Sequence, residues 1–330
     1  MRLVKNLCRI IVGIVFIYSG FVKGIDPLGS DYKFTDYFNA FGMGWMNATT
    51  LFFSFALSLA EFLIGIALLF NLWVSRMAWG ALLFMAFFTP LTLVLALTNP
   101  VSDCGCFGDA MILTNWQTFW KNIILLLLAI MIFVYRKEYK SSLSFMGQFS
   151  FLSLAGAGML CLSIYCYRHL PVLDFRPYAV GKNITEGMRL PEGAEPDQYE
   201  VTLKYKNKQT GEVRSFTEEN YPWQDTLNWE YESSSERLVK KGYITPIHDL
   251  VIEHPTLGNI TEEILEDDNH TILAVAYNLN QSATQYQPAI NRLAEYAREK
   301  GIRFYGLTSS SERDIEAYKK RNHVPYEFCT

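Results

Sequence analysis

The first half of this 330-residue chain has little charge, and no histidine occurs before His169. Zinc sites take four cysteine, histidine or carboxylate ligands. The two neighbouring thiols Cys104 and Cys106 would therefore need further ligands from distant sequence, and we predict no metal site. The chain also has no basic patch and no glycine-rich phosphate loop, which gives no indication of nucleic-acid or nucleotide binding.

What fills the first half is apolar sequence. Five runs are each about long enough for a lipid span, and they lie at about 7–22, 50–72, 73–97, 116–135 and 149–167. No small-x-small cleavage site follows the first run, so we interpret it as an uncleaved helix. The sequence therefore predicts an integral membrane protein with the lipid bilayer as a partner.

The distribution of lysine and arginine predicts an orientation, because short cytoplasmic loops carry an excess of these residues. Lys5 and Arg9 lie at the first run with Arg2, Arg76 follows the second, and a basic stretch at 136–140 follows the fourth. We expect a plasma (inner) membrane protein with a cytoplasmic N-terminus. The opposite side then receives the loop 102–109 and everything after the fifth span.

The loop SDCGCFGD at 102–109 holds two thiols, Cys104 and Cys106. Outside the cytoplasm, paired cysteines are usually disulfides or parts of a relay that makes them. A CGC pair closes a very small ring, so we expect its Cα atoms near the upper limit of disulfide geometry and a bond that is easily reduced. Asp103 and Asp109 act against thiolate formation. Two readings stay open: a redox pair, or a turn with incidental thiols.

Glu61 lies inside the second run, where a charge costs about 2.5–3.5 kcal/mol on insertion scales. It should therefore face the bundle interior, be protonated or find a cation, and Lys23 is the nearest candidate by depth. The pair is either structural or has a proton-handling or quinone-facing role. Cys166, near the outer end of the fifth run, could meet the cysteine pair or be an inert small hydrophobe.

The remaining segments predict ordinary elements. Residues 31–41 suit a short interfacial helix, and residues 198–206 and 212–216 suit a hairpin. From residue 270 the pattern alternates, with strands expected at 270–278, 302–308 and 324–329 and helices at 286–300 and 311–322, the last capped by Ser311. Such alternation predicts a parallel βαβαβ unit.

Three stretches resemble the DoxX-like superfamily and most closely the methylamine utilisation protein MauE: SGFVK at 19–23, Glu61 with Gly65, and DCGCFG at 103–108. The resemblance covers about residues 1–140 and implies assistance with disulfide formation or electron transfer outside the cytoplasm. A looser similarity to four-helix vitamin K epoxide reductases implies a quinone as electron acceptor, although this loop has no CxxC.

The segment 269–330 looks like a thioredoxin-like fold. The place where that fold carries CxxC is occupied here by residues 277–283, which include no cysteine, and Cys329 is the only thiol of the segment. We therefore interpret it as a degenerate thioredoxin-like module that binds or positions an extracytoplasmic protein partner.

The predicted fold class is an α-helical membrane bundle of four helices (1–140) and a fifth span (149–168), followed by a β-rich region (171–260) and a soluble α/β segment (269–330). The leading hypothesis is a membrane thiol–disulfide electron-transfer or disulfide-maturation protein. The alternative is a non-catalytic envelope assembly or scaffold protein whose soluble domain binds a partner. The candidate residues are Cys104, Cys106 and Glu61, supported by Cys166, Asp103, Asp109 and Lys23.

Overall fold

The computed structural model describes residues 2–101, 103–191, 193–194, 198–217, 220–240, 242–243, 245–247, 250–267 and 269–330. The chain divides into two compact units, Met1–Val180 and Gly181–Thr330. Each unit is described by itself.

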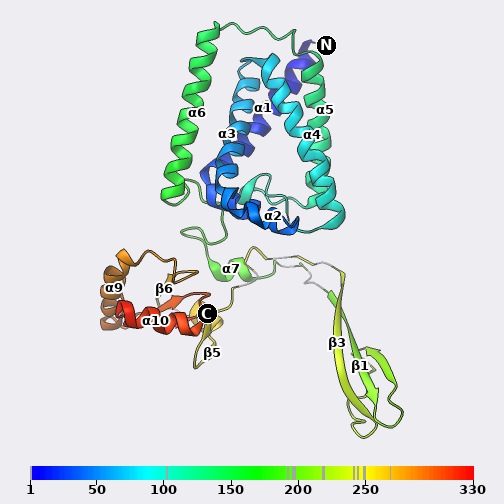
Figure 1. Cartoon of the computed structure of the whole chain (residues 1–330), viewed down its shortest axis with the longest axis vertical. Helices are drawn as coiled ribbons and strands as arrows, with labels where there is room; N and C mark the ends of the chain where they lie inside the picture. Colours follow the sequence, from blue (N-terminus) through cyan, green and yellow to red (C-terminus); the bar gives the residue numbers. More distant parts are fainter. Residues whose placement is uncertain are drawn as a thin grey trace. The chain divides into compact units, whose positions relative to one another are not determined.

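The first unit is a bundle of long helices (Figure 1). Within the described residues, five helices are long and apolar enough to cross a bilayer, and they confirm the five expected spans. The chain is therefore a multi-pass membrane protein. The helices are α1 (Arg2–Ile25), α3 (Thr50–Leu69, preceded by the 3-10 turn η1, Gly44–Thr49), α4 (Val74–Thr98), α5 (Asn115–Val134) and α6 (Phe145–Arg168).

Glycines allow α1 and α3 to approach very closely. A Cβ placed on Gly20 of α1 would lie 2.6 Å from the carbonyl oxygen of Ser58, and one on Gly65 of α3 would lie 2.8 Å from that of Gly13. Small residues at such crossings let helix backbones approach and gain dispersion contacts in lipid. The α1–α3 pair is thus the fixed centre against which the other helices pack.

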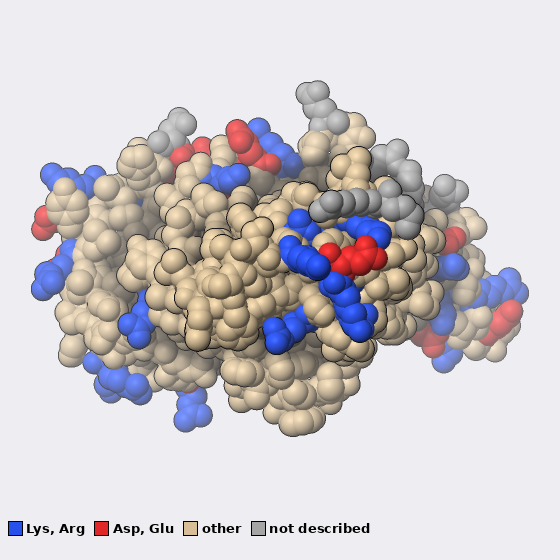
Figure 2. Space-filling view, turned by 90° about the horizontal axis from the view of Figure 1, so that it is seen from above, with Lys and Arg blue, Asp and Glu red and all other residues tan. Residues whose placement is uncertain are grey.

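One end of the bundle joins the N-terminus to two basic connections. The Lys5 ammonium lies 2.7 Å from a Glu138 carboxylate oxygen, the Tyr139 hydroxyl donates to the Lys5 carbonyl, and the Asn71 amide donates to the carbonyl of Lys140. Figure 2 looks at this end and shows lysine and arginine side chains gathered around a few acidic ones. The segments expected on one side of the membrane therefore do lie together.

The other end of the bundle carries α2 (Pro27–Ala40), which lies across it in Figure 1 and confirms the short helix expected near residues 31–41. Asp26 caps α2, since its side chain accepts a hydrogen bond from the backbone N–H of Gly29. The Ser54 hydroxyl of α3 donates to the Pro27 carbonyl over 2.7 Å. A short 3-10 turn, η2 (Gly108–Ala110), ends the cysteine loop at this same end.

The second unit contains a three-stranded antiparallel sheet. Its strands are β1 (Gln198–Asn207), β2 (Val213–Thr217) and β3 (Trp229–Lys240), in the order β2-β1-β3. The hairpin of β1 and β2 was predicted, whereas the sequence showed only aromatic residues where β3 begins. A short helix, α7 (Ile184–Met188), precedes the sheet in the chain.

A second sheet in this unit is parallel, in the order β6-β7-β8. Its strands β6 (Thr271–Val275), β7 (Arg303–Leu307) and β8 (Glu327–Cys329) alternate with α9 (Gln287–Glu299, after the turn η3, Thr284–Tyr286) and α10 (Glu312–Asn322). The predicted βαβαβ unit is therefore confirmed, and so is the Ser311 cap, whose side chain accepts from the Asp314 N–H.

Both faces of the parallel sheet are covered. Phe304 and Phe328 point to the face where Ala294 of α9 and Ile315 of α10 pack. The alternate residues pack on the other face beside α8 (Thr261–Leu265) and the two-stranded ladder of β4 (Glu253–His254) and β5 (Gly258–Asn259). This is a small α/β layer, and it does not by itself confirm a thioredoxin-like fold.

Candidate functional site

The cysteine loop folds into a tight turn closed by a disulfide between Cys104 and Cys106. The intervening Gly105 has a φ of +62°, a left-handed conformation that glycine adopts without steric cost. This turn brings the two Cα atoms to 5.3 Å, near the middle of the usual disulfide range. The expectation that they would lie near its upper limit is therefore wrong, because the glycine bends the backbone more sharply than an extended tripeptide would.

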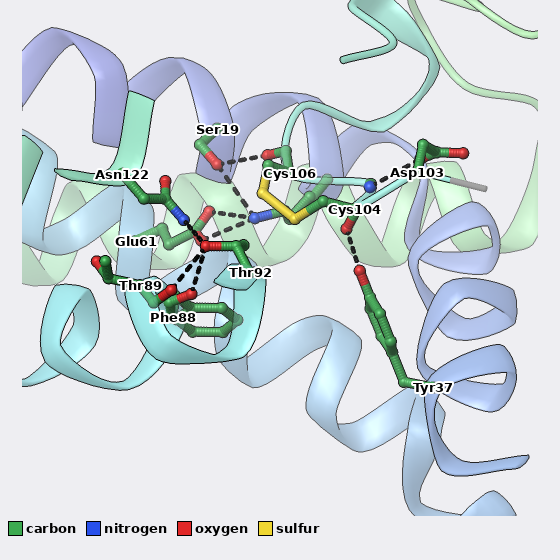
Figure 3. Close-up of a disulfide and its surroundings, with 12 residues drawn as sticks. Ser19, Tyr37, Glu61, Phe88, Thr89, Thr92, Asp103, Cys104, Cys106 and Asn122 are labelled. Carbon is green, nitrogen blue, oxygen red and sulfur yellow. Dashed lines mark hydrogen bonds and ion pairs between the residues drawn. A yellow bond between two sulfur atoms is a disulfide. The ribbon is translucent and has the colours of Figure 1, made fainter. Parts of the chain in front are cut away.

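Three side chains from neighbouring helices hold the loop (Figure 3). The Tyr37 hydroxyl of α2 donates to the Cys104 carbonyl over 2.6 Å, and the Ser19 hydroxyl of α1 donates to the Cys106 carbonyl over 2.7 Å. The Lys33 ammonium lies 2.7 Å from Asp103. Lys33 compensates the charge of Asp103, so this carboxylate opposes a thiolate less than the sequence suggested.

Tyr37 is a hydrogen-bond donor that keeps its proton. Burial, together with the nearby carboxylates of Asp103 and Asp36, raises the pKa of the Tyr37 phenol well above its usual range. The neutral hydroxyl is therefore available at neutral pH to hold the Cys104 carbonyl.

A buried ion pair lies beside the loop. The Lys23 ammonium of α1 is 2.7 and 2.9 Å from the two carboxylate oxygens of Glu61 on α3, and it also donates to the Ser19 hydroxyl over 3.1 Å. Only 8% of Lys23 and 3% of Glu61 is exposed. The predicted partnership is thus confirmed, and hydrogen bonds run continuously from Glu61 through Lys23 and Ser19 to the Cys106 carbonyl.

A cavity of about 70 Å³ lies between the disulfide and this ion pair, which is room for several water molecules. Its lining includes Cys104, Cys106, Lys23 and Glu61. Two polar residues of α5, Lys121 and Asn122, also face it, and the remaining wall is mostly apolar and includes Phe16, Phe34, Phe84, Phe88, Leu91 and Leu125. The structure therefore brings the two cysteines and both buried charges to one mainly apolar chamber.

Comparison with known proteins gives a match for this part of the chain. Residues 1–135 match the family model of methylamine utilisation protein MauE. This match covers α1, α3, α4 and α5 of the bundle and ends before α6. Residues 199–241, around the antiparallel sheet, match a domain of unknown function, DUF8463. No curated protein and no solved structure matches the chain, and neither the DoxX-like nor the thioredoxin-like resemblance has a counterpart in these findings.

Two other predicted site residues lie apart from the cavity under the disulfide. Cys166 is a buried free thiol on α6, outside the MauE match, and does not line that cavity. Asp109 is the last residue of the loop and lines a separate hollow with Asp26 and Arg176. In the part of the chain that the structure describes, no group of three or more histidine, cysteine or acidic residues could hold a metal ion.

Residues 1–135 also contribute side chains to which the sequence assigned no role in the site, namely Ser19, Lys33, Tyr37, Lys121 and Asn122. Lys121 and Asn122 carried a usable signal, since they interrupt an apolar run as Glu61 does. Ser19 and Tyr37 contact the loop through its backbone carbonyls, and Lys33 contacts it through Asp103. The positions of these three residues in the sequence do not indicate such contacts.

Proposed function

We propose that this membrane protein exchanges its Cys104–Cys106 disulfide with thiols of a protein outside the cytoplasm. One observation carries the proposal: the disulfide lies over a cavity that holds the buried Lys23–Glu61 pair, and Ser19 links that pair to Cys106. Burying two charged side chains costs free energy. A loop that served only as a tight turn would not require such a pair beside it.

The exchange balances without any group beyond the two proteins. A partner thiolate attacks one sulfur of the pair, the S–S bond breaks, and the other cysteine leaves as a thiolate. The partner's second thiolate then attacks the mixed disulfide and releases the first cysteine. The partner loses two electrons and gains a disulfide, while the pair gains two electrons and takes up two protons to become a dithiol.

The reduced pair must then be reoxidised, and the resemblance to vitamin K epoxide reductases implied a quinone for this role. Phe84 and Phe88 of the wall offer apolar faces, and Lys121 and Asn122 offer hydrogen-bond donors. The cavity of about 70 Å³ is nevertheless smaller than the roughly 150 Å³ that a benzene ring occupies in a protein. The cavity therefore does not fit a quinone ring, and no step of the exchange is placed on a quinone.

The proposal places the cysteine loop outside the cytoplasm. The basic residues gathered at the opposite end of the bundle support this orientation (Figure 2), because lysine and arginine favour the cytoplasmic side. The C-terminal unit follows α6, whose last residue, Arg168, belongs to the same end as the loop if α6 crosses the bilayer once.

Thiol labelling in intact cells tests the proposal. A membrane-impermeant maleimide should leave Cys104 and Cys106 unlabelled in untreated cells and label both after mild reduction. The double variant Cys104→Ser/Cys106→Ser should abolish exchange with envelope proteins, whereas Cys161→Ser, which removes an exposed thiol on α6, should not. The proposal fails if the pair is already reduced in native membranes, or if it reacts only after the cells are lysed.

The same variants test the scaffold alternative, which the C-terminal unit favours because the segment 277–283 has no cysteine. If the double serine variant keeps the normal pattern of disulfide-bonded envelope proteins while removal of residues 171–330 destroys it, the protein acts by holding a partner and not by exchange.

A further inference from the structure

The two halves of the disulfide lie in different electrostatic surroundings. On the Cys104 side lies the Asp103 carboxylate, whose charge is compensated by the Lys33 ammonium, and the Cys104 carbonyl accepts from the neutral Tyr37 hydroxyl. On the Cys106 side, the carbonyl accepts from Ser19, which itself accepts from the Lys23 ammonium. Figure 3 shows these contacts approaching the loop from opposite sides.

Lys121 adds to this difference. Its ammonium lies 4.2 Å from the centre of the ring of Phe107, the residue directly after Cys106. Lys121 also lines the cavity with both cysteines. It therefore sits on the Cys106 side of the loop, with a hydrocarbon stem that reaches in from α5.

The charges of the cavity do not cancel. Lys23 is paired with Glu61, and Lys33 is paired with Asp103. Among the described residues, no carboxylate oxygen lies within 4.0 Å of the Lys121 ammonium. In a mainly apolar chamber an unpaired charge acts on its neighbours more strongly than in water, so the lining favours an added negative charge near Phe107.

We propose that the disulfide is polarised, with the Cys104 sulfur as the atom that a partner thiolate attacks and Cys106 as the thiolate that leaves, stabilised by Lys121. This inference rests on the proposed exchange function and assigns roles within it. The more stable thiolate is the better leaving group in thiol–disulfide exchange. The attack forms a partner–Cys104 mixed disulfide, breaks the Cys104–Cys106 bond, and leaves the electron pair on the Cys106 sulfur.

Trapping with glutathione tests the direction of attack. The oxidised full-length protein in detergent is mixed with reduced glutathione, quenched with acid within the first turnover, alkylated, and mapped by fragmentation mass spectrometry. We expect glutathione on Cys104 and the alkyl group on Cys106, in at least about tenfold excess over the reverse. Equal amounts, or an excess on Cys106, would overturn the proposal.

The role of Lys121 is tested with each thiol alone. The variants Cys104→Ser and Cys106→Ser isolate Cys106 and Cys104, and the pH dependence of iodoacetamide alkylation gives a midpoint for each. We expect the Cys106 midpoint to lie about one pH unit below that of Cys104, a tenfold difference in thiolate fraction. Adding Lys121→Met should raise the Cys106 midpoint by about one unit and change that of Cys104 much less, while Lys121→Arg should keep it low.

Measuring Lys121→Met in both single-cysteine variants distinguishes an electrostatic effect from a structural one. A substitution that merely loosened the loop would move the midpoints of both Cys104 and Cys106. The same shift in both backgrounds, or none in either, would refute the role of Lys121. If Lys121→Met does not fold, the midpoints of the two single-cysteine variants and the glutathione map still decide the polarity. Failure of the proposed exchange function would be seen in a different experiment. In that case labelling in native membranes would find the pair reduced, while the alkylation midpoints of Cys104 and Cys106 in detergent could still be unequal.

Discussion

Breaking the Lys23–Glu61 pair should be among the most damaging single changes in the membrane unit. Glu61→Gln keeps the shape of the side chain but leaves the Lys23 ammonium, which is 8% exposed, without its counter-charge. Removing one partner of a buried pair costs about 3–5 kcal/mol.

Removing both charges should be far less harmful. Lys23→Met/Glu61→Met removes this ion pair as a whole, so neither member is left without its counter-charge, and buried pairs replaced by apolar residues are often neutral or stabilising by about 1–4 kcal/mol. With Lys23→Met and Glu61→Met as the single variants, the coupling energy of the double-mutant cycle should therefore be about 3 kcal/mol or more. The Lys5–Glu138 pair, whose glutamate is exposed, is the matched control and should give about 0.2–1 kcal/mol.

The assay is unfolding in mixed detergent micelles with increasing sodium dodecyl sulfate, followed by circular dichroism for the wild type, the single variants and the double variants. If Glu61→Gln lowers the free energy of unfolding by less than about 1 kcal/mol, the ion pair is more hydrated than its burial implies. A double variant as unstable as the sum of the two singles would refute the reasoning, because it would mean that the charges do not interact.

Three further changes follow from single contacts. Gly20→Ala should destabilise the bundle by about 1–3 kcal/mol in the same assay, because its Cβ would collide with α3, whereas Gly158→Ala, with open space around it, should not. Asp174→Asn should lower the melting temperature at neutral pH but not at about pH 2, because hydrogen bonds from Arg176 hold the pKa of Asp174 below its usual range. Ser311→Ala should cost about 1 kcal/mol in thermal unfolding of the C-terminal unit, because α10 loses its cap.

For each of these three substitutions, one outcome would contradict the structural reasoning. Equal losses for the two glycine variants would mean that α1 and α3 are farther apart than described. The Asp174 stabilisation is present above the unfolded pKa and disappears as the pH falls through the lower folded pKa, so a loss that persisted in acid would exclude the ion pair as its source. Ser309→Ala, a substitution in the exposed loop before α10, should leave the melting temperature unchanged.

The membrane spans and the βαβαβ unit could be predicted because burial leaves a periodic or continuous apolar pattern. Strand β3 could not, because its sequence WEYESSSERLVK has no sustained apolar alternation and its described side chains are mostly exposed. Its ladder with β1 comes from backbone hydrogen bonds, running from Asn207 opposite Trp229 back to Gln198. Pairing of this kind leaves little trace in side-chain hydrophobicity.

Some residues of the candidate site could likewise be predicted from the sequence, and others could not. Cys104, Cys106 and Glu61 could be singled out because thiols in a short loop and a carboxylate in an apolar run are rare. Lys121 lies within two turns of the start of α5, where a lysine ordinarily extends toward the membrane surface. Only the packing of α5 against α4 and α1 shows that its ammonium turns to the cavity beneath Phe107 instead.

The absence of histidine from the membrane half limits how protons reach the proposed dithiol. Reduction of the pair takes up two protons, and Tyr37 is a poor source because burial and nearby carboxylates raise the pKa of its phenol. The Ser19 hydroxyl donates to the Cys106 carbonyl and accepts from the Lys23 ammonium. Lys23 in turn donates to Glu61, so these hydrogen bonds connect the loop with Glu61. This chain of hydrogen bonds ends at the backbone carbonyl of Cys106 and not at a sulfur atom, so it holds the Cys106 side of the loop in place. Ser19→Ala should therefore slow the reduction of the disulfide in stopped-flow measurements while leaving the Lys23–Glu61 pair intact. An unchanged rate would mean that the loop keeps its conformation without Ser19.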